Sequence, residues 1–312
     1  MTSPVRTIFL GSGDFAVPIV TALARHSSIT LVGIITAPER GTPDPATDVP
    51  IAAWSLRAHI PMLRPARLRE PAVVEQVLRA KPELLVLADY GQIVPAALLA
   101  APSHAALNLH PSLLPRHRGA SPIQAAILEG DRETGVSIIA MDTGLDTGPI
   151  VAQARYAVDG TETAPELEAR LALLAADLLG DTLGPYLAGA IVPQVQPAEG
   201  MTLTHPLSRE DGRLDPVRGI EYLDRQIRAY LPWPGTFFET EAGRVIVWDA
   251  RPLGGGATRR AGTLMRLPAN RVGLAASDGL LELVEVQPAG GRRMSGAELL
   301  RGRPQLAGAI VS

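Results

Sequence analysis

Short apolar runs alternate with helical segments through the first half of the chain, and this alternation is the feature that most constrains the fold. Helical spacing follows the first run at 17–24, and Thr163 and Glu166 form a capping box that predicts a later helix. Strands that alternate with helices are typical of βαβ units and a mainly parallel sheet. The sequence therefore predicts an α/β domain over residues 1–190. The apolar runs cover residues 5–10, 29–35, 84–88, 106–110 and 135–141.

The pattern changes after a segment rich in proline and glycine. Residues 191–204 are only weakly periodic, which indicates a linker between domains. One helix is expected over 215–230. Short strand-like runs punctuated by glycine follow it, and such runs are typical of a small β-barrel. We expect a smaller, OB-like domain over 205–312. Its runs cover residues 237–239, 245–248, 262–265, 272–275 and 280–286.

The composition excludes several classes of protein. The chain of 312 residues is 46% apolar and 20% charged, which excludes wholesale disorder. It has no cysteine, which excludes a disulfide framework and a cysteine nucleophile and fits a reducing compartment. No charge-free apolar stretch reaches the roughly 18 residues of a membrane span, and the first apolar run is too short for a signal peptide. We expect a cytoplasmic protein with no membrane partner.

Charge is unevenly distributed along the chain. The net charge is −3, yet residues 201–312 hold 15 arginines against 12 acidic residues. A mildly basic C-terminal part suits a polyanionic partner, and chance scatter of surface charge is the alternative interpretation. The arginines that could contact phosphates are Arg209, Arg213, Arg218, Arg225, Arg228, Arg259, Arg260, Arg292 and Arg293.

A glycine-rich turn follows the first predicted strand. Residues 11–16 match the pattern G-x-G-x-x-A, which in Rossmann-like domains joins a strand to a helix. A helix N-terminus at this turn favours an anion, so one interpretation is a nicotinamide-dependent oxidoreductase. Asp14, however, places a negative charge where a pyrophosphate would lie, and a glycine turn also serves plain packing.

The most informative stretch begins at the fourth predicted strand. Asn108 and His110 alternate with two leucines, so both polar side chains project from one face. Pro111 ends the strand, and open α/β sheets bind ligands at such carboxyl ends. A glycine-flanked loop follows the fifth strand and can bring a carboxylate over this point. Asp146 is the preferred carboxylate, while Asp142 is nearer the strand and suits a capping role.

This trio suits acyl transfer to an amine. An Asn amide N–H can donate to the oxygen on which negative charge develops. An imidazole exchanges protons near neutral pH, and an aspartate can orient it and stabilise its charged form. No serine or cysteine nucleophile is needed, because the amine attacks directly.

At these residues the chain resembles the folate-dependent formyltransferases. The run from Asn108 to Gly119, NLHPSLLPRHRG, is similar to that family's motif, as are residues 122–124 and 144–148. The glycine turn at 11–16 and Tyr90-Gly91 also match. Past the linker, residues 231–234, 279–281 and 286–290 resemble the family's C-terminal domain, so the resemblance covers nearly the whole chain.

The resemblance implies a reaction and a set of site residues. The co-substrate would be 10-formyltetrahydrofolate, with no metal. Asn108 would polarise the formyl oxygen, His110 would act as acid and base, and Asp146 would position His110 or a water. The pterin would be held partly by backbone near 87–91 and 142–146. The implied cofactor-binding residues are Leu87, Ala88, Asp89, Tyr90, Gly91, Ser112, Leu113, Leu114, Pro115, Asp142 and Gly144.

The predicted C-terminal domain indicates which acceptor substrate receives the formyl group. Family members that act on free glycinamide ribonucleotide are typically single-domain, so a C-terminal domain implies a member that formylates the α-amine of methionyl initiator tRNA for translation initiation. In such a member, residues 205–312 would bind tRNA. We expect a monomer.

Three departures from the family pattern keep alternatives open. Residues 38–48 are short and acidic on balance where tRNA-binding members often carry a basic loop, so an amino-sugar nucleotide is an alternative acceptor. Asp89 stands where a small apolar residue is usual, and Gln92 is less apolar than expected. A noncatalytic RNA-binding module is a further alternative, suggested by the C-terminal arginines.

Overall fold

A computed structural model describes residues 3–38, 50–254 and 259–311. The chain divides into two compact units. The first comprises Met1–Pro122, Glu133–Ala157 and Glu168–Thr204, and the second comprises Ile123–Arg132, Val158–Leu167 and His205–Ser312. Each unit has a hydrophobic core of its own.

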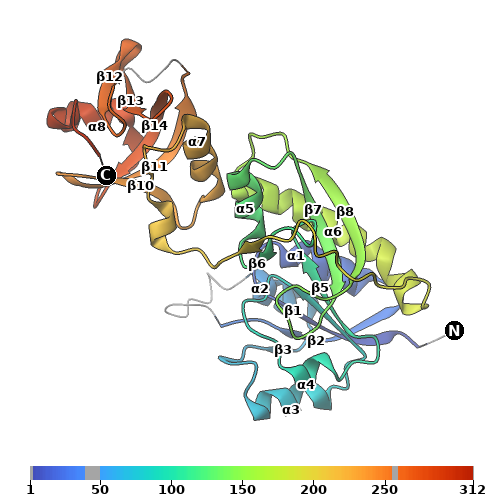
Figure 1. Cartoon of the computed structure of the whole chain (residues 1–312). Helices are drawn as coiled ribbons and strands as arrows, with labels where there is room; N and C mark the ends of the chain where they lie inside the picture. The colour runs from blue at the N-terminus through green and yellow to red at the C-terminus, as the bar shows by residue number, and fades with distance from the viewer. Residues whose placement is uncertain (1–2, 39–49, 255–258, 312) are drawn as a thin grey trace. The chain divides into compact units, whose positions relative to one another are not determined.

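A seven-stranded sheet forms the centre of the first unit (Figure 1). Its order is β3-β2-β1-β4-β5-β7-β8, with parallel pairing from β3 to β5 and antiparallel pairing from β5 to β8. The predicted Rossmann-like, mainly parallel sheet is confirmed. The strands are β1 (Val5–Gly11), β2 (Ile29–Ile35), β3 (Met62–Leu63), β4 (Leu84–Ala88), β5 (Ala106–His110), β7 (Glu133–Ala140) and β8 (Ile150–Ala157).

Helices connect these strands along the chain. Helix α6 begins at the predicted capping box, where the Thr163 N–H donates to Glu166 Oε2 over 2.9 Å. Its leucines Leu167, Leu171, Leu179 and Leu183 are buried. The helices are α1 (Ala16–Arg25), α2 (Pro50–Ala58), α3 (Pro71–Arg79), α4 (Ala96–Leu99), α5 (Pro122–Glu129) and α6 (Ala164–Leu187).

Strand register brings three segments to one edge of this sheet. Leu87 of β4 pairs with Asn108 of β5, and Ala88 of β4 pairs with Gly11 of β1. Because these strands are parallel, their carboxyl ends lie at the same edge. The glycine turn, the segment after β4 and the Asn-x-His strand end therefore lie side by side.

Two expectations for the first unit need correction. The strand predicted at 135–141 runs from Glu133 to Ala140, and β8 was missed. Along β8, exposed and less exposed residues alternate in an edge strand that includes Gln153 and Arg155, so it lacks the continuous apolar run that identified the other strands. The predicted linker also contains β9 (Leu203–Thr204), which pairs in parallel with β6 (Arg118–Gly119).

An antiparallel sheet forms most of the second unit, in keeping with the predicted small barrel. The order of its main strands is β10-β11-β14-β13-β12, and β15 pairs with β14. These strands are β10 (Thr236–Thr240), β11 (Gly243–Pro252), β12 (Leu264–Leu267), β13 (Arg271–Ala275), β14 (Leu280–Pro288) and β15 (Met294–Ser295).

The helix predicted over 215–230 is shorter than expected. Helix α7 (Ile220–Ala229) begins after Gly219, because Pro216 and Gly219 disfavour an earlier start. Helix α8 (Gly296–Gly302), which begins with a capping box at Ser295 and Glu298, was not predicted. Short 3₁₀ turns complete the unit: η2 (Arg209–Gly212), η3 (Pro268–Asn270) and η4 (Pro304–Leu306).

Candidate active site

The three predicted catalytic side chains come together at the carboxyl end of β5. Asn108 Nδ2 donates to Asp146 Oδ1 over 3.3 Å, and His110 Nδ1 lies 3.6 Å from Asp146 Oδ2. The side chains of His110 and Asp146 are only 6% and 14% exposed. One carboxylate thus faces both members of the Asn-x-His pair, one with each oxygen.

The backbone carbonyl of His117 determines which His110 nitrogen carries a hydrogen. His110 Nε2 lies 2.8 Å from this oxygen. Since a carbonyl oxygen only accepts, Nε2 is the donor. In the neutral imidazole the lone pair is then on Nδ1, which faces Asp146. Nδ1 is therefore the atom that can take a proton, and the carboxylate is placed to stabilise the resulting positive charge.

The Asn108 amide keeps a donor for a ligand. Its nitrogen carries two hydrogens, and one of them goes to Asp146. Within residues 3–38, 50–254 and 259–311, no hydrogen-bond partner receives the second. A half-buried donor at a strand end can bind an oxygen that gains negative charge during a reaction.

The loop that carries Asp146 is held from several sides. Asp146 has a φ of 52°, in the left-handed region that aspartate tolerates better than most residues. The Gly119 N–H donates to Asp146 Oδ2 over 2.8 Å. Gly148 lies so close to β7 that an added Cβ would be 2.0 Å from the Ala140 carbonyl oxygen. The direction of the Asp146 carboxylate is therefore set by the loop backbone and by β6.

Asp142 organises the same loop from within. Its Oδ1 accepts from the Gly144 N–H over 2.9 Å and from Thr147 Oγ1 over 2.7 Å. A Cβ on Gly144 would lie 2.0 Å from Thr147 Oγ1. Asp142 and Gly144 thus shape the turn, and contact with a cofactor remains a prediction for both.

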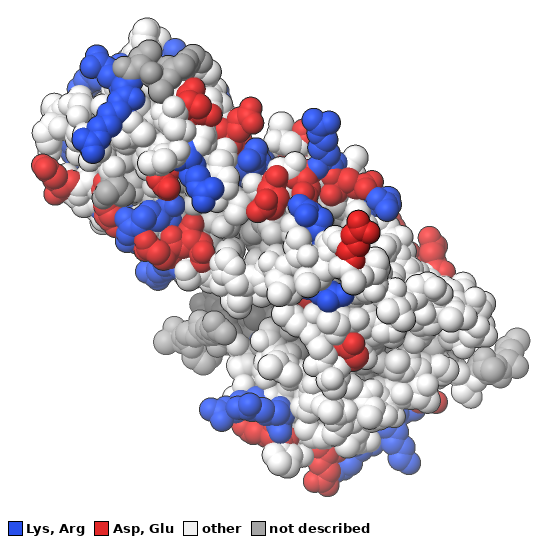
Figure 2. Space-filling view, viewed as in Figure 1, with Lys and Arg blue, Asp and Glu red and all other residues white. Residues whose placement is uncertain are grey.

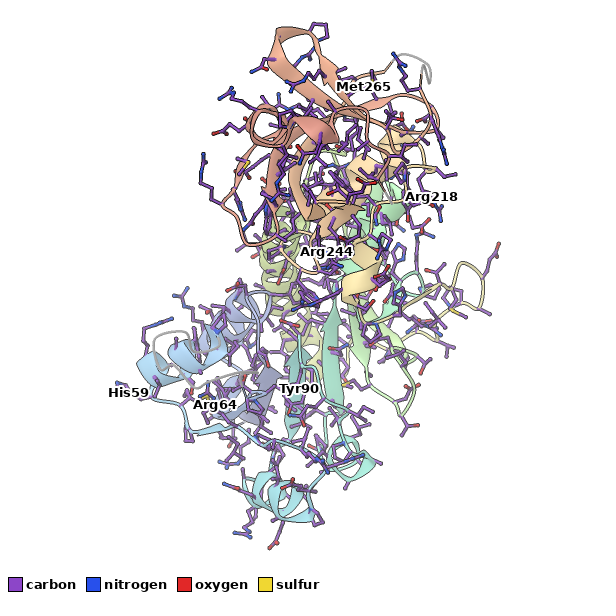
Figure 3. The ribbon with its side chains drawn as sticks, turned by 90° about the vertical axis from the view of Figure 1, so that its left-hand side faces the viewer. His59, Arg64, Tyr90, Arg218, Arg244 and Met265 are labelled. Atoms are coloured by element: carbon purple, nitrogen blue, oxygen red, sulfur yellow. The ribbon has the colours of Figure 1, made fainter. Side chains whose placement is uncertain are left out.

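The segment after β4 lies beside the trio. Leu87 and Ala88 are buried strand residues whose backbone neighbours Asn108 and Gly11. Tyr90, labelled in Figure 3, has a buried hydroxyl without a partner among the described residues, and burial raises its pKa to about 12. A buried unpaired hydroxyl is costly, so a ligand or a water that pairs with it is favoured. Gly91 has open space around it.

The residues from Ser112 to Pro115 belong to the loop that follows β5. The Ser112 hydroxyl donates to the Arg116 carbonyl over 2.7 Å, and the Leu114 N–H donates to Ser137 Oγ over 3.0 Å. Both residues are buried. Leu113 and Pro115 belong to the same internal loop, and cofactor contact stays a prediction for all of Ser112, Leu113, Leu114 and Pro115.

The side chain of Asp89 lies at the glycine turn. Asp89 Oδ2 accepts from the Gly13 N–H over 3.0 Å, and a Cβ on Gly13 would lie 2.0 Å from the same oxygen. In a dinucleotide-binding turn, that N–H would be offered to a phosphate. The departure noted at Asp89 therefore gives the turn a carboxylate of its own, which removes the support for a nicotinamide cofactor.

Two further carboxylates surround this turn. Burial raises the pKa of Glu168, and the negative charges of Asp89 and Asp14 raise it further, while the Phe15 N–H lowers it. The turn thus carries negative charge that is only partly compensated by backbone donors.

Several contacting residues were not found from the sequence. The His117 carbonyl, the Gly119 N–H, Gln196 and Thr202 all contact the trio or the groups that hold it. His117 and Gly119 lie inside the recognised motif, but their contribution is made by backbone atoms. Gln196 and Thr202 lie in the weakly periodic segment 191–204, where nothing in the pattern marks a polar residue as buried or bonded.

The described residues include no group of three His, Cys, Asp or Glu side chains arranged to hold a metal ion. None of the helices in the described part of the chain combines the length and apolar character needed to cross a bilayer.

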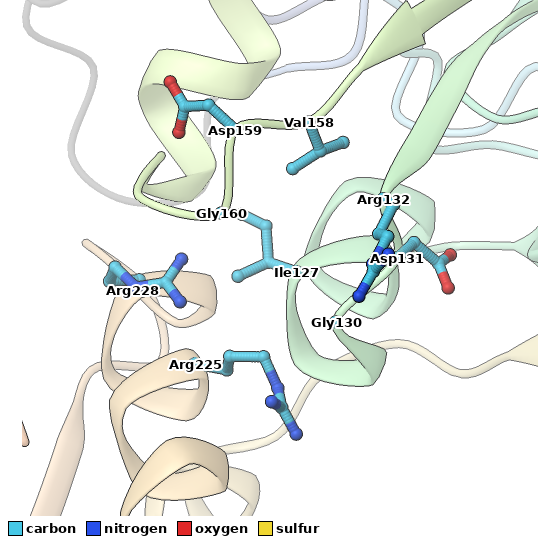
Figure 4. Close-up of a pocket in the computed structure, with 9 residues that line it drawn as sticks. All are labelled: Ile127, Gly130, Asp131, Arg132, Val158, Asp159, Gly160, Arg225 and Arg228. Atoms are coloured by element: carbon cyan, nitrogen blue, oxygen red, sulfur yellow. The ribbon is translucent and has the colours of Figure 1, made fainter.

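A pocket of about 380 Å³ lies in the second unit, and two of the arginines predicted to contact phosphates, Arg225 and Arg228, line it (Figure 4). Two of its arginines have partners within that unit: Arg225 Nε donates to the Leu128 carbonyl, and Arg228 contacts Asp224 and the Glu162 carbonyl. The lining residues are Ile127, Gly130, Asp131, Arg132, Val158, Asp159, Gly160, Arg225 and Arg228.

Many C-terminal arginines already have partners. Arg213, Arg228, Arg292 and Arg293 pair with carboxylates of their own unit. Arg218, labelled in Figure 3, lies 4.7 Å from the ring centroid of Tyr222. Figure 2 shows basic and acidic side chains interspersed on the face in view. Arg259 and Arg260 are exposed and have no carboxylate partner among the described residues. The acidic segment at 38–48 lies almost entirely outside those residues.

Comparisons with known proteins agree along the chain. The formyl transferase family model matches residues 5–183, and the model of the formyl transferase C-terminal domain matches residues 206–304. The chain is 38% identical to a methionyl-tRNA formyltransferase from Myxococcus xanthus, with 95% of both chains covered. It is 41% identical to one from Thermus thermophilus, with 96% of both chains covered.

Solved structures share the fold at lower identity. HypX from Aquifex aeolicus in complex with tetrahydrofolic acid has a TM-score of 0.65 and 16% identity, over 96% of this chain and 47% of that chain. A sugar N-formyltransferase from a Shewanella species has a TM-score of 0.62 and 18% identity, over 78% of this chain and 96% of that chain.

Proposed function

The chain belongs to the formyl transferase family, and from this we infer that it transfers the formyl group of 10-formyltetrahydrofolate to the α-amine of methionyl initiator tRNA. The product is N-formylmethionyl-tRNA, which serves translation initiation. The observation that carries the choice of acceptor is the 38–41% identity, over nearly the full length, to methionyl-tRNA formyltransferases. The sugar formyltransferases resemble the chain only in fold.

We propose that Asn108, His110 and Asp146 carry the chemistry. The unused Asn108 N–H would donate to the formyl oxygen as negative charge develops on it. His110 Nδ1 would take the proton that the attacking amine loses, while Nε2 keeps its bond to the His117 carbonyl. Asp146 would stabilise the charged imidazole. His110 would then return this proton to N10 of the co-substrate, so that the bond from N10 to the formyl carbon breaks as the bond to the amine forms and tetrahydrofolate leaves.

The residues beside the trio fit a folate. The buried, unpaired Tyr90 hydroxyl offers a polar anchor among apolar neighbours. The backbone of 87–91 runs beside Asn108, and we propose that it holds the pterin together with the 142–146 loop. The other proposed contacts come from Ser112, Leu113, Leu114 and Pro115.

We propose residues 1–190 as the catalytic domain, 191–204 as the linker and 205–312 as the tRNA-binding domain. The two family models, which end at 183 and begin at 206, support this division. Arg259 and Arg260 are the proposed phosphate contacts, because both are exposed and neither is neutralised by a described carboxylate. We also propose that the protein acts as a monomer in the cytoplasm, where its acceptor is made and used.

A direct assay separates the two candidate acceptors. The purified chain is incubated with 10-formyltetrahydrofolate and either methionyl initiator tRNA or a nucleotide-linked amino sugar, and formylated product is measured. We expect product from the tRNA and none above background from the sugar. The reverse result would replace the proposed acceptor with the amino-sugar nucleotide.

A further inference from the structure

Segment 191–204, which the sequence indicates only as a linker, contributes side chains that bond to Asp146 and His117, the two residues that face the ring nitrogens of His110. We propose that Gln196 and Thr202 are positioning residues of the formyl-transfer site. Gln196 fixes the Asp146 backbone, and through it the place of the Asp146 carboxylate, and Thr202 fixes the His117 backbone whose carbonyl binds His110. The proposal rests on the proposed function, because it assigns these residues to the same site.

Gln196 closes a ring of hydrogen bonds around Asp146. Its Nε2 donates to the Asp146 carbonyl over 2.7 Å, and its Oε1 accepts from Arg118 Nε and Nη2 over 3.0 and 2.7 Å. The next residue after Arg118 is Gly119, whose N–H donates to Asp146 Oδ2 over 2.8 Å. Both the backbone and the side chain of Asp146 are therefore linked to β6. The backbone is linked through Gln196 and the side chain directly.

The bonding of Gln196 suits an amide and no other side chain. It is 8% exposed, and the second Nε2 hydrogen goes to the Gly148 carbonyl over 2.7 Å. Two donors meet two carbonyls, and the oxygen meets a guanidinium, so every hydrogen-bonding atom of the group is used. A carboxylate at this place would face two carbonyl oxygens without a hydrogen to give. A buried amide with four matched bonds holds its loop in one arrangement.

Thr202 acts on the other side of the imidazole. Its Oγ1 accepts from the His117 N–H over 2.8 Å and lies 3.3 Å from His117 Nδ1. The Thr202 carbonyl accepts from the Arg118 N–H over 3.0 Å. These bonds hold the peptide whose carbonyl lies 2.8 Å from His110 Nε2. Thr202 thereby supports the contact that leaves the Nδ1 lone pair facing Asp146.

Matched variants separate positioning from folding. Gln196→Met keeps the length of the side chain and loses all four bonds, and Gln196→Glu keeps only the contact with Arg118. Gln194→Ala is the control in the same segment, because the Gln194 side chain is exposed and, among the residues that the structure describes, bonds only to the Val192 carbonyl. Thr202→Val loses the hydroxyl, and Thr202→Ser restores it. Thermal melting of each variant checks that it is folded.

Two readouts are compared in the full-length protein. We expect Gln196→Met, Gln196→Glu and Thr202→Val to lower kcat by about 10–100-fold, with KM for methionyl-tRNA changed by less than about twofold, since misplaced catalytic groups cost turnover. The ¹⁵N chemical shifts of the His110 ring, assigned with a His110→Asn variant, should move in the same variants. Gln194→Ala and Thr202→Ser should match the wild type in both measurements.

The possible failures are distinguishable. Folded Gln196 and Thr202 variants with wild-type kcat and unshifted His110 resonances would overturn the positioning roles. If the Gln196 variants do not fold, the Thr202→Val and Thr202→Ser pair decides by the same criteria. A wild-type chain that does not formylate methionyl-tRNA, with His110 resonances that still move in the variants, would overturn the proposed function and leave the positioning roles standing.

Discussion

The carboxylate of Asp146 lies 3.6 Å from His110 Nδ1. In the neutral imidazole this nitrogen carries no hydrogen, because Nε2 donates the ring hydrogen to the His117 carbonyl. The separation is longer than a hydrogen bond and within the range of an ion pair. A proton placed on Nδ1 therefore meets a negative charge already held in position by the Gly119 N–H. This pairing gives His110 a defined place to receive a proton.

Removal of that charge tests the pairing. Asp146→Asn keeps the shape of the side chain but loses the charge that stabilises a protonated imidazole, so we expect kcat to fall by at least about 100-fold. The fold should survive, because the amide oxygen can still accept from Gly119. Steady-state formylation together with a thermal melt measures both effects. A variant with more than half of wild-type kcat would contradict the role of Asp146.

The loop that carries Asp146 depends on Gly148. In Gly148→Ala the new Cβ would lie 2.0 Å from the Ala140 carbonyl oxygen, so the loop must move away from β7. We expect a loss of roughly 1–3 kcal/mol in the free energy of unfolding, together with reduced turnover. Chemical denaturation and the formylation assay check the two effects.

Gly180 in α6 provides the control for this prediction. A Cβ there meets nothing within 4 Å, and its backbone is helical. Gly180→Ala should stabilise the chain by about 0.5–1 kcal/mol and leave turnover unchanged. Equal stability of Gly148→Ala and wild type would show that the close approach to Ala140 does not constrain the loop.

The carboxylates around the glycine turn predict a pH-dependent stability. Burial and the charges of Asp89 and Asp14 raise the pKa of Glu168 in the folded state. A raised folded pKa favours the protonated form, so its stabilising effect is complete below the unfolded pKa of about 4.3 and is lost as the pH rises through the folded pKa. Above the unfolded pKa, Glu168 therefore destabilises the fold relative to a side chain that stays uncharged.

Glu168→Gln should remove this effect. We expect the variant to melt a few degrees above wild type at pH 7.5, with the difference closing near pH 4. Calorimetry at both pH values measures the difference in melting temperature. A Glu168→Gln variant that melts below wild type at pH 7.5 would contradict the account of this cluster.

The proposed phosphate contacts predict a salt effect on tRNA binding. Arg259→Ala combined with Arg260→Ala should weaken binding of methionyl-tRNA and reduce the slope of log K against log salt by about 1–2, since each lost phosphate contact removes about one released counterion. Arg292→Ala is the control, because Arg292 already pairs with Glu298. An unchanged slope in the double variant would place the tRNA contacts elsewhere.

Regular patterns made most of the fold predictable. The apolar runs at 84–88 and 106–110 gave β4 and β5 with their observed bounds, and alternation along 106–110 put Asn108 and His110 on one face. β8 could not be predicted in the same way, since an edge strand with alternating exposure lacks a continuous apolar run. Helical periodicity placed the start of α7 too early, because the chain becomes helical only after Gly219.

The sequence predicted the site residues that act through their side chains, but it did not predict those that act through backbone atoms. The types and spacing of Asn108, His110 and Asp146 indicated their chemistry before their geometry was known. The contacts of the His117 carbonyl and the Gly119 N–H could not be predicted from residue type, because nearly every residue has these backbone atoms. Gln196 contacts Asp146 across 50 residues of sequence, and only the folded structure brings the two together.

The single-turnover rate of formyl transfer by Asn108→Ala, measured with saturating 10-formyltetrahydrofolate and methionyl initiator tRNA, tests the central claim most directly. Loss of the amide N–H should lower this rate by about 10²–10³-fold while the variant still binds tRNA as the wild type does. A rate equal to that of the wild type would show that the end of β5 is not where the formyl group is transferred.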